Sequence, residues 1–412
     1  MGHAQAQALG YADLPIAVMP HPFGLLTRAE VRTLASTLVD QIAILACEAV
    51  PVTSTAMTRA DSQIAMLAVP DDLDEINRLF RKNDWTDGLP IVPPTARRVE
   101  RMLACTHRNA DDVIATIAPG YGIATVKRIA VNAVMAGCDP EYLPLLIAAV
   151  EAVVPAEFNL QGIQTTTNPV AVWLIVNGPV VKRLNLNAGI NCLGQGNWAN
   201  ATLGRALHLI LQNVGRALPG EMDRATHGQP GKYVFCCAES DELNPWEPLH
   251  VEKGYRLDQC TVTVVGAEGT LNMNTHVKNA DDLLHVIAET LPRPPSNDYL
   301  HGGNPWLILC PEHADILKSA GLSKSDVKRR LWEQSKMAVR RLPAKDLERI
   351  HGSVSDLNPC VPTGELVGIV KWWCKTEPNP RSLSEADGNR CRVCPCFRAF
   401  VRGSVCLISY AA

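Results

Sequence analysis

The stretch NCLGQGNWANATLGR, residues 191–205, runs directly into an apolar helical pattern at 206–214. Its glycines let the backbone approach another group closely, and a helix that begins here would point its free N–H groups at the same place. Such N–H groups favour an anionic ligand. The stretch therefore predicts a loop, a helix over 199–218 and a small anionic molecule as the ligand.

Strands and helices are expected to alternate on both sides of this loop. The pattern predicts strands at 113–118, 170–177, 233–238, 261–265 and 306–310, and helices at 72–82, 125–136, 140–154, 281–290, 312–320 and 325–337. This alternation indicates an α/β fold, with a mixed or parallel sheet flanked by helices.

The first fifty residues predict a separate strand-loop-helix unit. Residues 13–19 are interpreted as a short buried strand, and Thr27 with Glu30 forms a capping box. The helix that follows would carry one apolar face, made of Val31, Leu34, Leu38, Ile42 and Leu45. Because the strand has no partner before it, residues 1–50 are expected to be a truncated α/β unit that docks on the rest of the chain.

Three further segments complete the expected organisation. Residues 51–70 are interpreted as a linker, and 71–370 as a large α/β domain. From about residue 371 the α/β pattern stops, and the Cys-rich motif CRVCPC at 391–396 supplies only half of a tetrahedral zinc site. We therefore expect 371–412 to be a disordered or frame-shifted tail.

Composition excludes several classes of function. The chain has 39 basic and 42 acidic residues and a net charge of −3, so it lacks the electrostatic footprint of nucleic-acid or membrane-surface binding. No apolar run approaches the ~20 residues of a membrane-spanning helix, and no signal-peptide pattern is found. Fourteen scattered cysteines indicate reduced thiols. These features predict a cytoplasmic protein.

The glycines of the loop do not form a nucleotide-binding motif. After Gly194 and Gly196 the third glycine comes at 204, and no Gly-Lys-Ser/Thr follows. ATP and NAD are therefore unsupported, and the cofactor is left unknown.

Amide and hydroxyl side chains are dense around the predicted strand at 170–177 and the loop after it. They predict a binding site for a carboxylate or phosphate, with Arg205 one turn into the helix. The alternative is that Asn and Gly only cap and turn a tight loop. The candidate ligand-binding residues are Thr166, Asn168, Asn177, Gly194, Gly196, Asn197, Asn200 and Arg205.

Four residues are candidates for catalysis. His227 lies in a Gly-flanked loop, Glu239 ends a predicted strand and His250 follows soon after, so the three could transfer protons or bind a metal ion. Their spacing matches no metal motif, which favours a network of hydrogen-bonded loop residues. Cys192 enters the Gly-rich loop, where a helix N-terminus would activate its thiol, although a buried apolar role is the simpler interpretation.

Several long motifs resemble the UGSC family, named for a selenocysteine-Gly-Ser-Cys motif. DLPIAVMPHPF at 13–23 is similar to the second half of the UGSC domain. DWTDGLPIVPPT at 84–95 and ATVKRIAVNAVMAGCDPEYLP at 124–144 resemble the large domain that accompanies it, as does the loop at 194–205. The resemblance implies thiol- or selenol-linked redox chemistry. Only twelve residues precede Asp13, however, and none of them is a cysteine.

These observations leave three hypotheses, and whether the chain is an enzyme stays open. It is an enzyme acting on a small anionic molecule, a thiol-redox subunit served by a separate selenocysteine/Cys protein, or a non-catalytic binding or assembly protein. An unpaired strand in the N-terminal unit would leave a sheet edge exposed, which predicts an oligomer.

Overall fold

The computed structural model describes residues 2–20, 26–47, 66–291, 305–335 and 343, together with the backbone of the strands at 391–394 and 405–408. The helices are α1 Gly2–Ala8, α2 Arg28–Cys47, α3 Leu73–Lys82, α4 Ala96–Leu103, α5 Val126–Ala136, α6 Leu143–Val153, α7 Leu160–Thr165, α8 Val180–Arg183, α9 Trp198–Asn213, α10 Leu249–Glu252, α11 Ala280–Thr290, α13 Pro311–Ser319 and α14 Lys324–Gln334. The strands are β1 Val113–Ile117, β2 Gly122–Thr125, β3 Ala171–Asn177, β4 Cys236–Ala238, β5 Cys260–Ala267, β6 Thr270–Met273, β7 Trp306–Ile308, β8 Cys391–Cys394 and β9 Val405–Ile408.

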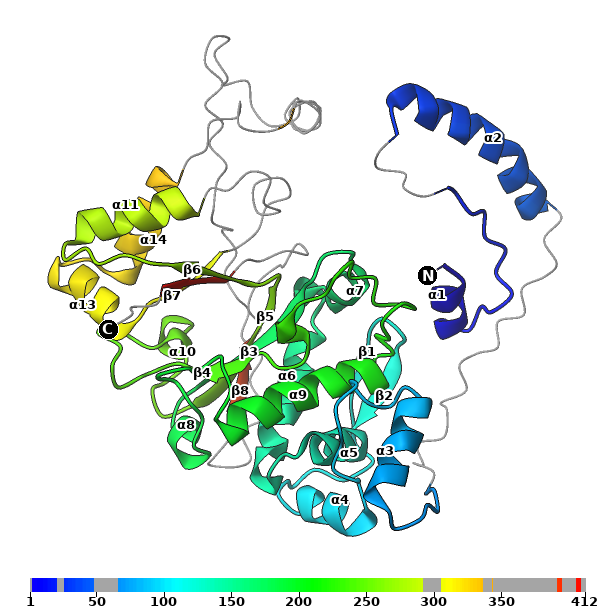
Figure 1. Ribbon diagram of the computed structural model, residues 1–412, viewed down its shortest axis with the longest axis horizontal. Coiled ribbons are helices and arrows are strands. Elements are labelled where there is room, and N and C mark those ends of the chain that lie inside the picture. The colour runs from blue at the N-terminus through cyan, green and yellow to red at the C-terminus, as the bar shows by residue number, and fades with distance from the viewer. Residues whose placement is uncertain are drawn as a thin grey trace.

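A mixed sheet lies at the centre of the fold, with strand order β4-β3-β5-β8 (Figure 1). β3 runs parallel to β4 and antiparallel to β5, and β5 runs parallel to β8. A second sheet, β6-β9-β7, is parallel, and β1 and β2 form an antiparallel pair. The predicted α/β fold with a mixed sheet is therefore confirmed.

β3 is the strand around which the core is built, and all seven of its residues are buried. Because side chains alternate along a strand, Val172, Leu174 and Val176 face one hydrophobic cluster and Trp173 and Ile175 face another. Burial on both faces explains why the sequence reads as a continuous apolar run.

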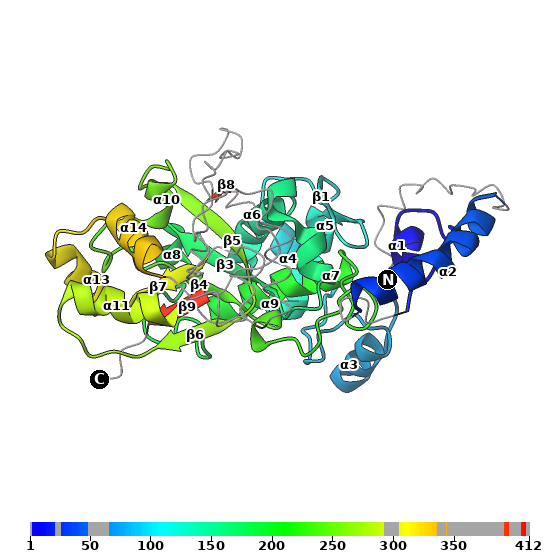
Figure 2. The same ribbon diagram turned by 90° about the horizontal axis from the view of Figure 1, so that it is seen from above.

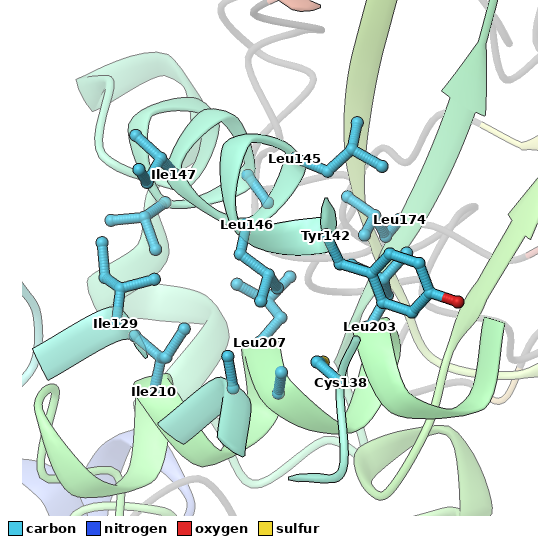
Figure 3. Close-up of a cluster of buried hydrophobic side chains, with 14 of the residues drawn as sticks. Ile129, Cys138, Tyr142, Leu145, Leu146, Ile147, Leu174, Leu203, Leu207 and Ile210 are labelled. Atoms are coloured by element: carbon cyan, nitrogen blue, oxygen red, sulfur yellow. The ribbon is translucent and has the colours of Figure 1, made fainter. Parts of the chain in front are cut away.

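The larger cluster lies between β3 and the helices α5, α6 and α9. Figure 3 shows Leu174 near side chains from α6, such as Leu145 and Leu146, and from α9, such as Leu203 and Leu207. Each buried Leu contributes about 1.5–3 kcal/mol to folding. This packing fixes the position of α9, and with it the loop that leads into the helix.

Local capping agrees with the sequence for two helices of the large domain. Thr125 caps α5 by accepting a hydrogen bond from the N–H of Arg128, and Gly137 ends the helix with φ of 88°. Ser323 and Asp326 form a capping box at the start of α14. A third cluster packs α11, α13 and α14 together, beside the sheet that contains β6 (Figure 2).

The expected strand at 13–19 is wrong for the residues described, because residues 14–20 adopt no regular structure and α1 precedes them. A strand is stabilised by the ladder it forms with a neighbour, and this segment has none: Val18 and Met19 are exposed. The helix after it is confirmed as α2, with Thr27 and Glu30 hydrogen-bonded as a capping box. Leu38 is the side chain that α2 buries.

The end of α9 also differs from the sequence prediction. α9 ends at Asn213 rather than at 218, because Arg216 turns the chain with φ of 58° before the Pro-Gly pair is reached. Within 371–412, expected to be a disordered or frame-shifted tail, the described residues are those of β8, which pairs with β5, and β9, which pairs with β6 and β7.

Substitution of Gly178 by alanine is expected to destabilise the fold more than the same change at Gly254. Both glycines have φ of 88°, which an L-residue adopts at a cost of about 1 kcal/mol. A Cβ at Gly178 would also lie 2.2 Å from the carbonyl oxygen of Gln259, whereas no atom lies within 4 Å at Gly254. Urea unfolding should therefore show a loss of about 2–4 kcal/mol for Gly178→Ala and about 1 kcal/mol for Gly254→Ala. Equal losses would contradict the steric argument.

No single helix in the described part of the chain is long and apolar enough to cross a membrane. One bent pair, 140–153 with 156–165, passes that test by length and composition, and most α6 residues in it are buried in the core.

Candidate functional site

The loop at 187–200 is held together by the side chain of Asn200, which lies in the first turn of α9 and is buried. Its Oδ1 accepts a hydrogen bond from the N–H of Asn187 at 3.0 Å, and its Nδ2 donates to the carbonyl oxygens of Asn187 and Cys192, both at 3.0 Å. Asn197 caps α9 through the N–H of Asn200 and donates to Asn185. These two predicted ligand residues therefore shape the loop.

The glycines of the loop also determine its shape. A Cβ at Gly194 would lie 2.1 Å from the side chain of Asn191, which donates to the carbonyl of Gln195 at 2.7 Å. Gly196 has φ of 112° and faces open space. The sequence predicts that these glycines form a turn and also bind a ligand. The contacts within the loop explain the turn.

Arg205 is engaged by the protein itself. Its guanidinium binds Asp87 through two hydrogen bonds of 2.7 and 2.9 Å and donates to the carbonyl of Pro90 at 2.9 Å. Both side chains of the pair are largely buried, at 14% and 10% exposed. Burial opposes ionisation of Asp87, but the hydrogen bond and charge of Arg205 outweigh it and lower the pKa of Asp87. An anionic ligand at Arg205 would have to displace this carboxylate.

The loop places Cys192 beside Cys237, which lies in β4. Both are free thiols, and Cys192 packs at the edge of the cluster that contains Cys237. The Cys237 thiol donates a hydrogen bond to the Cys192 sulfur, and this bond, aided by the backbone N–H groups of Cys192 and Leu193, lowers the pKa of Cys192 to about 7. The same bond, together with complete burial, raises the pKa of Cys237 well above its ordinary value.

The two thiols differ in accessibility as well as in acidity. Cys192 is partly exposed, whereas Cys237 is 5% exposed. A thiolate is the nucleophilic form of cysteine, so Cys192 is the reactive member of the pair at neutral pH.

Asn177, Glu239 and His250 gather at the end of β3, near this pair. Asn177 donates to Glu239 at 2.5 Å, and Glu239 also accepts from the N–H of Leu249 at 2.8 Å and from Asn244 at 2.8 Å. Burial raises the pKa of Glu239. His250 is 1% exposed, and its Nε2 lies 3.4 Å from the carbonyl of Leu257. Among the described residues, Glu239 therefore forms a hydrogen-bonded network with Asn177, Asn244 and Leu249, and His250 is not hydrogen-bonded to it. The network favoured from the sequence also included His227, which is not part of it.

His227, Thr166 and Asn168 lie at the opposite end of β3. Thr226, next to His227, donates its N–H to the carbonyl of Thr167 at 2.9 Å, just before β3 begins. Asn168 bonds to Thr166 through its backbone N–H at 3.1 Å. A strand of seven residues is roughly 20 Å long. The strand therefore separates His227 from Glu239 and His250, so the three do not form the acid/base or metal cluster that the sequence left open as the less favoured alternative.

The partners of Arg205 and Cys192 in the fold are not visible in the sequence. Asp87 lies in a Pro- and Gly-rich segment with no charge pattern that points to Arg205, and Cys237 has the pattern of a buried apolar residue. His208 is a packed histidine whose Nδ1 lies 2.9 Å from the carbonyl of Gly204, and burial lowers its pKa to about 4.

No family model, curated protein or solved structure matches the chain. Within the described ranges, no three His, Cys, Asp or Glu side chains gather closely enough to hold a metal ion. The candidate site consequently rests on the geometry of Cys192 and Cys237.

Proposed function

We propose that this protein is a thiol-based oxidoreductase whose reacting groups are Cys192 and Cys237. The observation that carries the proposal is that the partly exposed Cys192 packs against the cluster that contains the buried Cys237, where the two thiols interact and the pKa of Cys192 is lowered. A nucleophilic thiolate with a second thiol in contact is the arrangement that thiol–disulfide exchange requires. The resemblance to the UGSC family, whose name refers to a redox motif, agrees with this chemistry.

The reaction begins with a substrate that carries a disulfide. The Cys192 thiolate attacks one substrate sulfur, so a mixed disulfide forms and the other substrate sulfur leaves as a thiolate. The Cys237 thiol then passes its proton to that thiolate, attacks the Cys192 sulfur and breaks the mixed disulfide. The products are a Cys192–Cys237 disulfide and a substrate dithiol, after a second proton has been taken from water, so two electrons have moved from the protein to the substrate.

The surrounding protein supports each step. Hydrogen bonding from Asn200 to the Cys192 carbonyl fixes the loop, so the attacking sulfur is held in place. Packing of β4 against β3 fixes Cys237. A separate thiol or selenol protein would return the disulfide to the dithiol, and a cytoplasmic location would keep the resting pair reduced.

Two other functions have less support. An enzyme for a small anionic molecule would need Arg205, which Asp87 occupies, and His227, which lies at the far end of β3. An oligomeric assembly role remains a hypothesis without a structural observation of its own.

Mass spectrometry tests the dithiol directly. Reduced protein is mixed with an excess of a peptide disulfide, blocked with iodoacetamide and digested with trypsin. We expect a disulfide-linked pair of the peptides 184–205 and 233–253, and its loss in Cys192→Ser. Cys105→Ser is the matched control, because Cys105 is partly exposed but burial raises its pKa. Modification that is unchanged by Cys192→Ser would refute the proposal.

A further inference from the structure

Two buried oxygen atoms at one end of the central sheet have no hydrogen-bond partner among the residues that the structure describes. They are Oδ1 of Asn177 and Oγ1 of Thr261, and both residues are 0% exposed. Burial of a polar oxygen without a partner costs free energy, so folded proteins pair nearly all such atoms with protein groups, water or an ion. The two oxygens therefore indicate a bound group that supplies positive charge or hydrogen-bond donors.

The two oxygens belong to the same face of the sheet. Asn177 and Thr261 lie opposite each other in the antiparallel register of β3 and β5, so their Cβ atoms are about 5 Å apart. Their neighbours Val176 and Val262 belong to the cluster on the α6 and α9 side, so Asn177 and Thr261 project from the other side. One small group between the two side chains can therefore contact both oxygens.

Glu239 adds a carboxylate at the same place. Asn177 donates to this carboxylate through Nδ2, which fixes the orientation of the amide and leaves Oδ1 beside the carboxylate. Glu239 is partly exposed, so a small solute can reach it. An amide oxygen, a hydroxyl oxygen and a carboxylate are the ligands that hard cations prefer.

The surrounding charges favour a cation with a single positive charge. Glu239 interacts electrostatically with Asp241 and with Lys324. Lys324 and Lys328 both form salt bridges with Glu252. These three carboxylates and two ammonium groups leave one negative charge without a counterpart. A divalent metal ion would need more ligands of the acidic, His or Cys type than the described residues gather in one place.

We propose that Asn177, Thr261 and Glu239 bind a monovalent cation, which is either an inorganic ion such as potassium or the ammonium group of a small amine. The amide and hydroxyl oxygens contact the cation, and the carboxylate neutralises its charge. A cation bound here joins β3 and β5 to the segment that follows β4. The site is independent of the thiol chemistry of Cys192 and Cys237.

Thermal unfolding of the full chain tests the cation site. Chlorides of potassium, sodium, ammonium and methylammonium at about 0.1 M are compared with tetramethylammonium chloride, whose cation is larger and has no N–H group to donate. We expect a midpoint about 3 °C higher with at least one small cation than with tetramethylammonium. A rise with potassium or sodium but not with methylammonium identifies an inorganic ion, and a rise that is largest with methylammonium identifies an amine.

Variants at Thr261 separate binding at this site from general effects of salt. Thr261→Val replaces Oγ1 by a methyl group of similar size and should reduce the rise to less than about 1 °C. Thr261→Ser keeps the hydroxyl and should retain the rise. Thr263→Val is the matched control, because Thr263 is 1% exposed on the same face of β5 but lies opposite Ile175 rather than Asn177.

Two results would overturn the proposal. One is the same midpoint in every salt, which would mean that water alone pairs the two oxygens. The other is a rise that Thr261→Val leaves unchanged, because the cation would then bind elsewhere. Both results leave the dithiol chemistry standing.

Discussion

Substitution of Arg205 by alanine is expected to lower the free energy of unfolding by about 3–5 kcal/mol. The change removes a bidentate partner from the buried Asp87 carboxylate and a donor from the carbonyl of Pro90. An unpaired charge would then be left in a largely buried place. Because these groups join residues 87–90 to α9, the packing of this segment on the helix should weaken.

Urea unfolding, followed by far-UV circular dichroism, measures this effect. Asp87→Leu with Arg205→Met in the same chain provides the control, since replacing both charges by apolar groups leaves neither unpaired. We expect the double variant to be more stable than either single variant, which is the mark of direct coupling. If the loss of stability in the double variant equals the sum of the losses in the two single variants, the ion pair does not stabilise the segment.

The pH dependence of the same measurement checks the sign of the electrostatic contribution. The pKa of Asp87 is lowered in the folded protein, so its ionisation stabilises the fold above about pH 4 and this contribution is lost as the pH falls through the folded pKa. The difference between wild type and Asp87→Leu should therefore shrink in acid. A difference that grows below pH 4 would contradict this assignment.

Substitution of Cys237 by alanine is expected to raise the pKa of Cys192 from about 7 towards 9, because the largest cause of the lowered value is the hydrogen bond from Cys237. At pH 7 the thiolate fraction would fall about 50-fold. A more basic thiolate is also a better nucleophile, by about eightfold over two pKa units. The net result is alkylation that is about sixfold slower at pH 7.

The rate of iodoacetamide alkylation of Cys192 between pH 5 and 10, with the modified peptide quantified by mass spectrometry, gives both pKa values. Cys237→Ser is the matched variant, because its hydroxyl keeps a donor while the second thiol is removed. We expect its pKa to lie between those of wild type and Cys237→Ala. An identical profile in all three proteins would show that Cys237 does not stabilise the thiolate.

Much of the fold follows from local sequence patterns. The apolar run at β3, Thr125 and Gly137 around α5, and the capping box of α14 each act on neighbouring residues, so each is visible in the sequence. The segment 13–19 shows the limit of such reasoning: its residues favour a strand, but a strand forms only where another strand supplies hydrogen bonds. The tail strands β8 and β9 show the converse, because their pairing with β5, β6 and β7 depends on chain far away in sequence.

The order of residues is enough to establish that the loop before α9 is tight, rich in amides and uncharged, and that Cys192 lies within it. What these residues do depends on tertiary packing, which pairs Arg205 with Asp87 and Cys192 with Cys237 and separates His227 from Glu239 by the length of β3. Hydrogen bonds and charge interactions depend on distance in space, and residues far apart in sequence reach contact distance only when the sheet and helices are packed.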